Sequence, residues 1–139
     1  MYEKKIPENY ECGISVALKV LGGKWNPLII EYIHLGKRRP SELHRAVDQA
    51  NPRVINMALR ELEDYGMLTK KIYPGLPLKV EYYLTPLGES VIPIIEAMEA
   101  WGHQHREQIV PDYSMPDQVI CNGAVKYSKE GEEKLSQAE

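Results

Sequence analysis

The chain has 139 residues and a formal net charge of −3, with 43% hydrophobic and 27% charged residues. This composition excludes a wholly disordered chain, and the length suits one domain, or one domain with a tail. No apolar run approaches the roughly 20 residues of a membrane span. Residues 1–5 lead into no apolar segment of the kind that marks a secretory signal. We therefore expect a cytoplasmic protein with no membrane partner.

The charge is distributed unevenly along the chain. Residues 22–83 hold ten basic and seven acidic residues, a net charge of +3, whereas the rest of the chain carries −6. The overall charge, taken alone, argues against a nucleic-acid-binding protein. A mildly basic centre between acidic ends is compatible with one.

Two short amphipathic helices open the chain. Apolar residues at helical spacing predict a helix over residues 12–21, which Gly22-Gly23 ends because glycine is favoured just past a helix C-terminus. Asn26-Pro27 is typical of an N-cap followed by a first-turn proline. It predicts a second helix over residues 27–34.

The next two predicted helices form a helix-turn-helix. Ser41 is the candidate N-cap of a short helix that runs to about Val47. Asn51-Pro52 repeats the signal of a cap plus a proline and starts a longer helix that ends near Tyr65. Two helices joined by a turn of about three or four residues are the helix-turn-helix pattern.

The longer helix has two distinct faces at 100° per residue. The predicted inner face is apolar and consists of Ile55, Ala58, Leu59, Leu62 and Tyr65. The predicted outer face consists of Arg53, Met57, Arg60 and Asp64, with Asn56 at its flank. Two guanidinium groups and an amide near the helix start suit a helix that enters the major groove of DNA.

A β-hairpin is predicted after this helix. Residues 68–73 and 79–84 have strand character, and Pro74-Gly75-Leu76-Pro77 is a turn-rich loop between them. A hairpin that follows a helix-turn-helix is a wing.

A long apolar helix is predicted beyond the wing. Thr85-Pro86 gives a third cap-plus-proline start for a helix to about Gln108, with a kink at Pro93. Its broad apolar stripe exceeds what a small winged domain needs, so we expect it to form a dimer interface. Residues 111–139 form a tail with a short strand within 119–125.

Several of these segments together resemble one protein family. The Gly22-Gly23-Lys24-Trp25 motif and the Val80-Glu81-Tyr82-Tyr83-Leu84-Thr85 segment carry most of the likeness, which covers roughly residues 10–108. The chain resembles the HxlR family of bacterial winged helix-turn-helix regulators, related to the MarR group. Met57, where a polar residue is common, and Ala58, where a basic one is, depart from the family pattern.

The resemblance implies a homodimer that binds a palindromic operator in double-stranded DNA, with its first and last helices in the interface. It implies no enzymatic activity, and some members sense oxidants or electrophiles through a cysteine near the N-terminus, a position that Cys12 matches. The expected fold is mainly α with a small β-hairpin wing (α+β), a winged helix-turn-helix that dimerises through its terminal helices. Residues 1–110 would form this DNA-binding and dimerisation domain, and residues 111–139 the tail.

Five residues are the candidate DNA contacts: Ser41, Arg53, Asn56, Arg60 and Lys79. Asparagine can bind adenine, and arginine can bind guanine or phosphate. The alternatives are a solvated helix face for the three recognition-helix residues, an intrahelical ion pair for Arg60, and a strand-edge lysine for Lys79. Ser41 could cap its helix and bind phosphate at once.

Cys12 is the candidate redox sensor, and its alternative role is that of a small buried hydrophobic residue. His103 and His105 lie two apart and point to different faces of a helix, so we expect no metal site and no cofactor. No catalytic motif is present in the sequence, so we expect no enzyme. The predicted function is a DNA-binding transcription regulator, with an oxidant or a small molecule as its effector. The competing prediction is a winged-helix module that binds proteins and not DNA.

Overall fold

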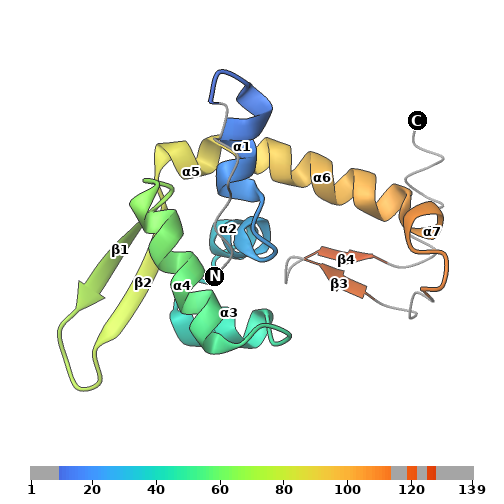
Figure 1. Ribbon diagram of the computed structural model, residues 1–139. Coiled ribbons are helices and arrows are strands. Elements are labelled where there is room, and N and C mark those ends of the chain that lie inside the picture. The colour runs from blue at the N-terminus through green and yellow to red at the C-terminus, as the bar shows by residue number, and fades with distance from the viewer. Residues whose placement is uncertain (1–9, 114–118, 122–124, 128–139) are drawn as a thin grey trace.

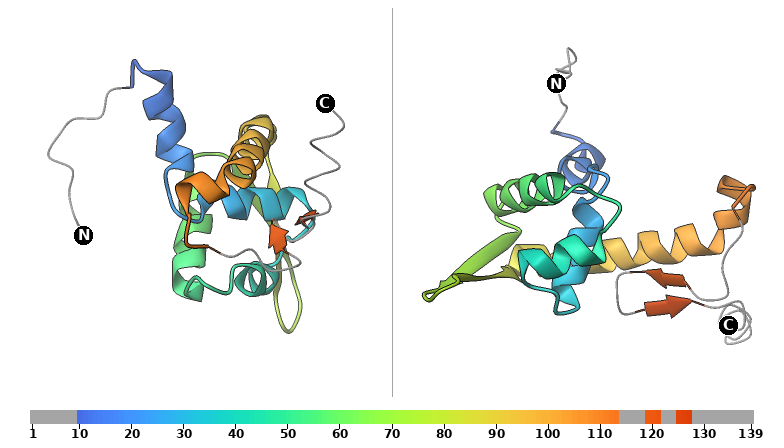
Figure 2. Two further views of the ribbon diagram at one scale, coloured as in Figure 1. Left: turned by 90° about the vertical axis from the view of Figure 1, so that its right-hand side faces the viewer. Right: turned by 90° about the horizontal axis from the view of Figure 1, so that it is seen from below.

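The structure, a computed structural model, describes residues 10–113, 119–121 and 125–127. Its elements in chain order are α1 (Gly13–Leu21), α2 (Asn26–His34), α3 (Pro40–Ala46), α4 (Pro52–Asp64), β1 (Leu68–Tyr73), β2 (Lys79–Leu84), α5 (Pro86–Ser90), α6 (Ile92–Gln104), α7 (Arg106–Ile109), β3 (Val119–Cys121) and β4 (Val125–Tyr127). The β1–β2 hairpin and α6 project from opposite sides of the helical body (Figures 1 and 2). The predicted fold, mainly helical with a winged helix-turn-helix, is confirmed.

The second helix begins one residue before its predicted start. Trp25 is the residue at the N-cap, so the predicted capping role of Asn26 is wrong. Asn26 is instead buried as the first helical residue, and its Nδ2 donates to the carbonyl oxygen of Val20, 2.9 Å away. This hydrogen bond ties the start of α2 to the end of α1.

The two helices of the helix-turn-helix differ in how they begin. The predicted cap of α4 is confirmed, because Asn51 Oδ1 accepts a hydrogen bond from the Arg53 backbone N–H at 2.8 Å. Ser41 is not the N-cap of α3, since the helix already begins at Pro40 and Arg39 occupies the cap position. The Arg39 backbone N–H donates to Glu42 Oε1 at 3.2 Å. The Ser41 side chain is therefore not needed as a cap.

The wing has the predicted bounds. β1 and β2 are antiparallel, with Leu68 opposite Leu84 and Tyr73 opposite Lys79. The segment before α3 extends this ribbon, because the Tyr82 N–H donates to the Arg38 carbonyl oxygen at 2.8 Å. The wing is thus anchored to the start of the helix-turn-helix.

The single kinked helix predicted over residues 86–108 is wrong, because the structure divides this segment into α5, α6 and α7. Thr85 caps α5 as predicted, since its Oγ1 accepts from the Gly88 N–H at 3.1 Å. The first break falls at Val91, and Pro93 then lies in the first turn of α6. A proline there removes no helical hydrogen bond, so the chain stops and restarts instead of bending.

The predicted short strand within 119–125 is instead two strands, β3 and β4, which pair antiparallel with Val119 opposite Tyr127. Residues 114–118, 122–124 and 128–139 lie outside the described residues. The division of the chain at residue 110 remains a prediction.

The core is built around α2. The largest fully buried side chains come from α2, α3 and α4 and are Ile29, Ile30, Ile33, Leu43, Ile55, Leu59 and Leu62. The predicted inner face of α4 is confirmed, because Tyr65 packs against this cluster and the other four residues belong to it. The outer face of α4 is thereby fixed as a surface.

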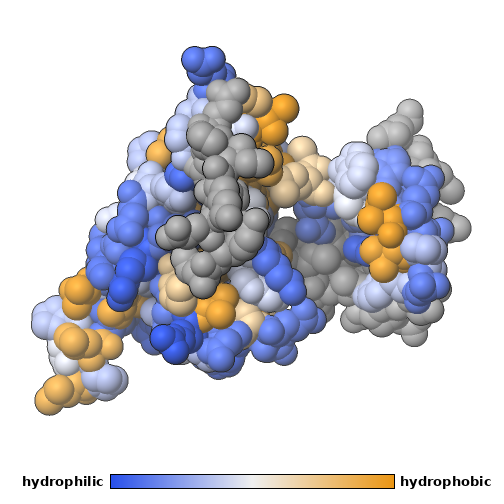
Figure 3. Space-filling model, viewed as in Figure 1, coloured by the Kyte–Doolittle hydropathy of each residue, from blue (hydrophilic) through white to orange (hydrophobic). Residues whose placement is uncertain are grey.

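Apolar side chains also remain at the surface of the terminal helices. In α1, Leu18 is 59% exposed, and in α6 Met98 and Trp101 are 48% and 58% exposed. Figure 3 shows apolar residues beside α1, around α7 and at the wing tip. These helices keep apolar surface that the described residues do not cover.

Glu31 is a buried carboxylate in the middle of α2, and it is only 3% exposed. Its Oε2 atom has no hydrogen-bond partner among the described residues. Burial raises the pKa of Glu31, and the nearby Glu96 and Glu99 carboxylates raise it further, while His34 opposes them. The charged form of Glu31 therefore destabilises the folded state.

We predict that Glu31→Gln stabilises the protein at pH 7 to 8 by about 1 to 3 kcal/mol, because the amide keeps the shape of the side chain and removes its buried charge. The raised folded-state pKa means that the contribution of Glu31 to stability is fully present below its unfolded pKa and is lost as pH rises through the folded value. The difference in stability between Glu31→Gln and wild type should disappear as pH falls toward about 4. Thermal unfolding across this pH range measures it. Glu61→Gln, at an exposed carboxylate of α4, is the control, and a gap independent of pH would contradict the prediction.

Candidate nucleic-acid interface

The outer face of α4 is exposed as predicted. Arg53, Asn56, Met57 and Arg60 are all exposed, whereas Ala58 is buried, as its position on the helix indicated. Within the described part of the chain, Arg53 makes no ion pair, and the Asn51 cap fixes the backbone beside it. The first half of α4 thus presents a cation and an amide to solvent.

Arg60 does not form the intrahelical ion pair that its acidic neighbours allowed. Glu63 Oε1 lies 3.8 Å from Lys70 Nζ of β1, and no ion pair of Arg60 occurs among the described residues. The Arg60 charge does act on Tyr82. Burial first and Glu63 second raise the pKa of Tyr82, and Arg60 lowers it. Arg60 therefore lies where α4 meets the wing.

Asn56 contacts the first helix of the helix-turn-helix. Its Oδ1 atom lies 2.9 Å from His44 Nε2 of α3. Sequence patterns gave no sign of this contact, because the two residues are twelve positions apart and belong to different helices.

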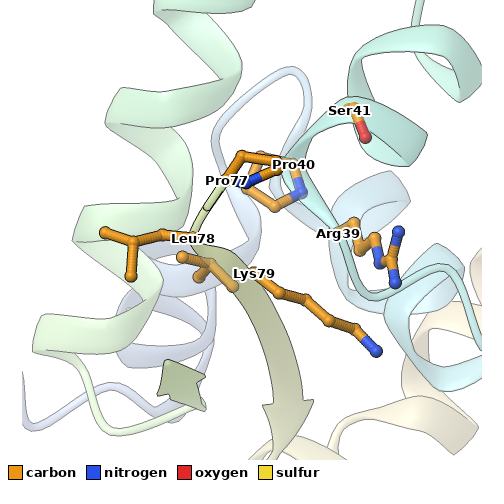
Figure 4. A pocket seen from close by; sticks show the side chains of 7 residues that line it. Arg39, Pro40, Ser41, Pro77, Leu78 and Lys79 are labelled. Carbon is orange, nitrogen blue, oxygen red and sulfur yellow. The ribbon is translucent and has the colours of Figure 1, made fainter. Parts of the chain in front are cut away.

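A hollow of about 500 Å³ lies between the start of α3 and the tip half of the wing, at the end of the loop 74–78 and the start of β2. Its lining residues are Arg39, Pro40, Ser41, Pro77, Leu78, Lys79 and Val80. Figure 4 shows the side chains of Arg39 and Lys79 extending toward the same side, while Leu78 points the other way. The structure thus brings together two predicted residues, Ser41 and Lys79, and adds Arg39. The basic run Lys37-Arg38-Arg39 was the only sequence signal for this third residue.

Three basic side chains in or beside the wing lie near tyrosine rings. Lys79 Nζ lies 5.2 Å from the Tyr73 ring centroid and 3.6 Å from Glu81 Oε1. Lys71 and Arg38 lie over the Tyr83 ring, at 4.9 and 4.3 Å from its centroid. These contacts hold the basic groups along one face of the hairpin. 

Tyrosine contacts also join the strands on this face of the hairpin. A hydrogen bond with Tyr83 is the first cause that raises the pKa of the Tyr73 hydroxyl, followed by burial. This contact links β1 to β2 next to the basic groups.

Cys12 occupies the N-cap position of α1 and carries a free, half-buried thiol. Its pKa is lowered, first by the backbone N–H of Ser15, then by that of Ile14 and by the Ser15 side chain, while burial opposes the shift. The lysines at positions 4 and 5, which could add to this effect, lie outside the described residues. A thiol with a lowered pKa is more readily converted to the reactive thiolate.

In the described ranges, no three His, Cys, Asp or Glu side chains gather closely enough to hold a metal ion. No helix of this part of the chain is long and apolar enough to cross a membrane.

A buried helical core, a helix-turn-helix with an exposed second helix, and a basic wing define a winged helix-turn-helix transcription regulator. The model of the HxlR-like helix-turn-helix family matches residues 20–110. The chain belongs to this family, which confirms the resemblance seen in the sequence.

Similar proteins are transcription regulators. An HTH-type transcriptional regulator of Methanothermobacter thermautotrophicus is 40% identical over 98 residues, which are 70% of this chain and 75% of that protein. The reduced form of the redox regulator HypR has a TM-score of 0.67 and 33% identity, covering 73% of this chain and all of that one. The reduced form of the Bacillus subtilis transcriptional regulator YodB has a TM-score of 0.60 and 30% identity, covering 70% and 96%. The chain is accordingly a transcriptional regulator with a DNA-binding helix-turn-helix.

Proposed function

We propose that the chain acts as a homodimer that binds a palindromic operator in duplex DNA, and that it has no catalytic activity. The observation that carries the proposal is the exposed first half of α4, together with the hollow between α3 and the tip half of the wing that Arg39 and Lys79 line. The first supplies groups that bind base edges, and the second supplies groups that bind phosphate. Family membership supports the DNA target.

The candidate residues divide into two roles. Arg53 and Asn56, near the start of α4, enter the major groove, where base edges offer distinct donor and acceptor patterns. Arg39, Ser41 and Lys79 bind phosphate groups, which set the position of the protein on the duplex without reading sequence. Arg60, next to the wing, binds the backbone on the far side of the groove.

The exposed apolar surface of α1 and α6 supports the proposed homodimer. Leu18, Met98 and Trp101 are each about half exposed, and a second copy can bury them. A two-fold dimer presents two copies of α4. Its half-sites should lie about one helical turn of DNA apart, or a multiple of it.

A winged-helix module that binds proteins instead of DNA is the competing function. Met57, exposed on α4, is the observation that favours it. Selection of duplexes from a random library, followed by binding at several salt concentrations, separates the two. DNA binding weakens steeply with salt because counterions are released, and a module without DNA binding selects no sequence.

We predict that Arg53→Ala weakens binding to the selected operator and reduces the slope of log affinity against log salt by about one for each lost phosphate contact. If Arg53 binds a base instead, affinity should fall by roughly ten- to a hundredfold and discrimination at one base position should relax. Fluorescence anisotropy over a salt series measures both. Arg45→Ala, at an exposed cation of α3, is the matched control. An Arg53→Ala variant that folds and binds like wild type would refute the contact.

We predict that Trp101→Glu or Leu18→Glu converts the dimer to a monomer, because a charge replaces an apolar side chain in the shared surface. Analytical ultracentrifugation gives the mass, and operator binding should weaken in parallel. Leu76→Glu at the fully exposed wing tip is the control and should keep the dimer mass. A monomeric wild-type protein would rule out the homodimer.

We further propose that oxidation of Cys12 alters operator binding. The support is the lowered pKa of its thiol at the start of α1 and the likeness to the redox regulator HypR. Treatment with diamide should change wild-type affinity, whereas Cys12→Ser should bind equally with and without the oxidant. Cys121→Ser should respond like wild type. An oxidant-insensitive wild-type protein would remove Cys12 as a sensor.

A further inference from the structure

The contact between His44 and Asn56 joins two side chains that have different access to DNA. His44 is half-buried on α3, and Asn56 is exposed on α4, with His44 Nε2 and Asn56 Oδ1 separated by 2.9 Å. An amide oxygen only accepts hydrogen bonds, so the histidine ring donates through an N–H on Nε2. The amide of the candidate base-reading residue is thus held by a neighbouring helix.

The hydrogen bond with His44 favours one of the two orientations of the Asn56 amide. An asparagine amide that turns by 180° exchanges its acceptor Oδ1 and its donor Nδ2. With Oδ1 held next to α3, Nδ2 lies on the side away from α3. The oxygen keeps a second lone pair, so the amide still offers one acceptor and one donor in a fixed order.

Adenine matches such an ordered pair. Its major-groove edge offers an acceptor at N7 and a donor at N6, and asparagine can bind both at once. Guanine offers two acceptors, N7 and O6, so one of them would lie against the Oδ1 atom of Asn56, which is itself an acceptor. Either orientation leaves one guanine acceptor unmatched, so only adenine can form both hydrogen bonds. An amide already held in one order loses less rotational freedom when both bonds to adenine form, and this strengthens the preference for adenine.

The contact is not needed to hold the two helices together. α3 and α4 already share the buried core that contains Leu43 and Ile55. A hydrogen bond in an exposed position adds little to stability, because water offers each group an alternative partner. The hydrogen bond between His44 and Asn56 therefore acts mainly on the orientation of the Asn56 amide.

We propose that His44 is a positioning residue, which fixes the Asn56 amide so that this side chain reads adenine in the major groove. The proposal rests on the proposed DNA-binding function and adds to it a base and a second residue. His44 acts through Asn56 and needs no contact with DNA of its own.

Duplex selection and competitive binding with four variants test this role: His44→Ala, His44→Gln, Asn56→Ala and the double variant His44→Ala with Asn56→Ala. Wild type should select adenine at one position of each half-site. His44→Ala should lower the preference for adenine at that position by about five- to tenfold, part of the discrimination expected of a bidentate contact. His44→Gln, whose amide N–H can replace the ring N–H, should restore much of the preference. The double variant should match Asn56→Ala alone, because the two residues act as one unit.

Three results would overturn the proposal. Unchanged adenine preference in His44→Ala would refute it while leaving the DNA-binding function intact. The same would follow from a loss of affinity that persists in the Asn56→Ala background, since His44 would then act on DNA or on folding directly. A wild-type protein that selects no duplex would refute the proposed function as well. His34→Ala is the control histidine, because His34 pairs with Glu89 of α5 at 3.1 Å and should not affect base preference.

Discussion

The burial of α2 on all its sides is the constraint on which the rest of the structure depends. Ile29, Ile30 and Ile33 are fully buried, and helices from both halves of the chain pack around them. Because α3 and α4 cover this cluster with Leu43, Ile55 and other apolar side chains, the opposite face of α4 can only face solvent. The exposed outer face of α4 is therefore a consequence of the core, and its polar side chains are not needed for packing.

The sequence predicted a helix start well where the capping side chain and the backbone group that it binds belong to the same helix. Asn51 caps its own helix through the N–H two residues ahead, so the sequence suffices to find it. Asn26 carries the same signal followed by the same proline, yet its side chain binds the Val20 carbonyl of the preceding helix. That choice depends on how α1 and α2 pack, and packing is not encoded in a cap motif. 

The break at Val91 was missed for a related reason. The apolar residues keep their helical spacing throughout residues 86–108, although the helical backbone is interrupted at Val91. The spacing therefore gave no sign of the break.

The candidate DNA-binding residues show the same difference between features set within one helix and contacts made between elements. The exposed positions of α4 followed from helical periodicity, because a buried stripe on one side defines the other. Arg39 was missed, since its importance arises only when the wing folds back beside the start of α3. The contact between His44 and Asn56 depends on how α3 and α4 cross. No spacing rule along the sequence predicts it. 

The net charge of −3 takes on a different meaning once the ion pairs are placed. Lys70 faces Glu63 and Lys79 faces Glu81, so part of the basic charge of the wing is already matched by carboxylates. Exposed pairs of this kind are weak and exchange readily with other partners. The paired carboxylates still reduce the positive charge that a phosphate group meets, so attraction to DNA of any sequence should be modest. A regulator with such a surface depends on hydrogen-bond geometry at a few side chains, which is why the orientation of one amide can matter as much as an additional charge.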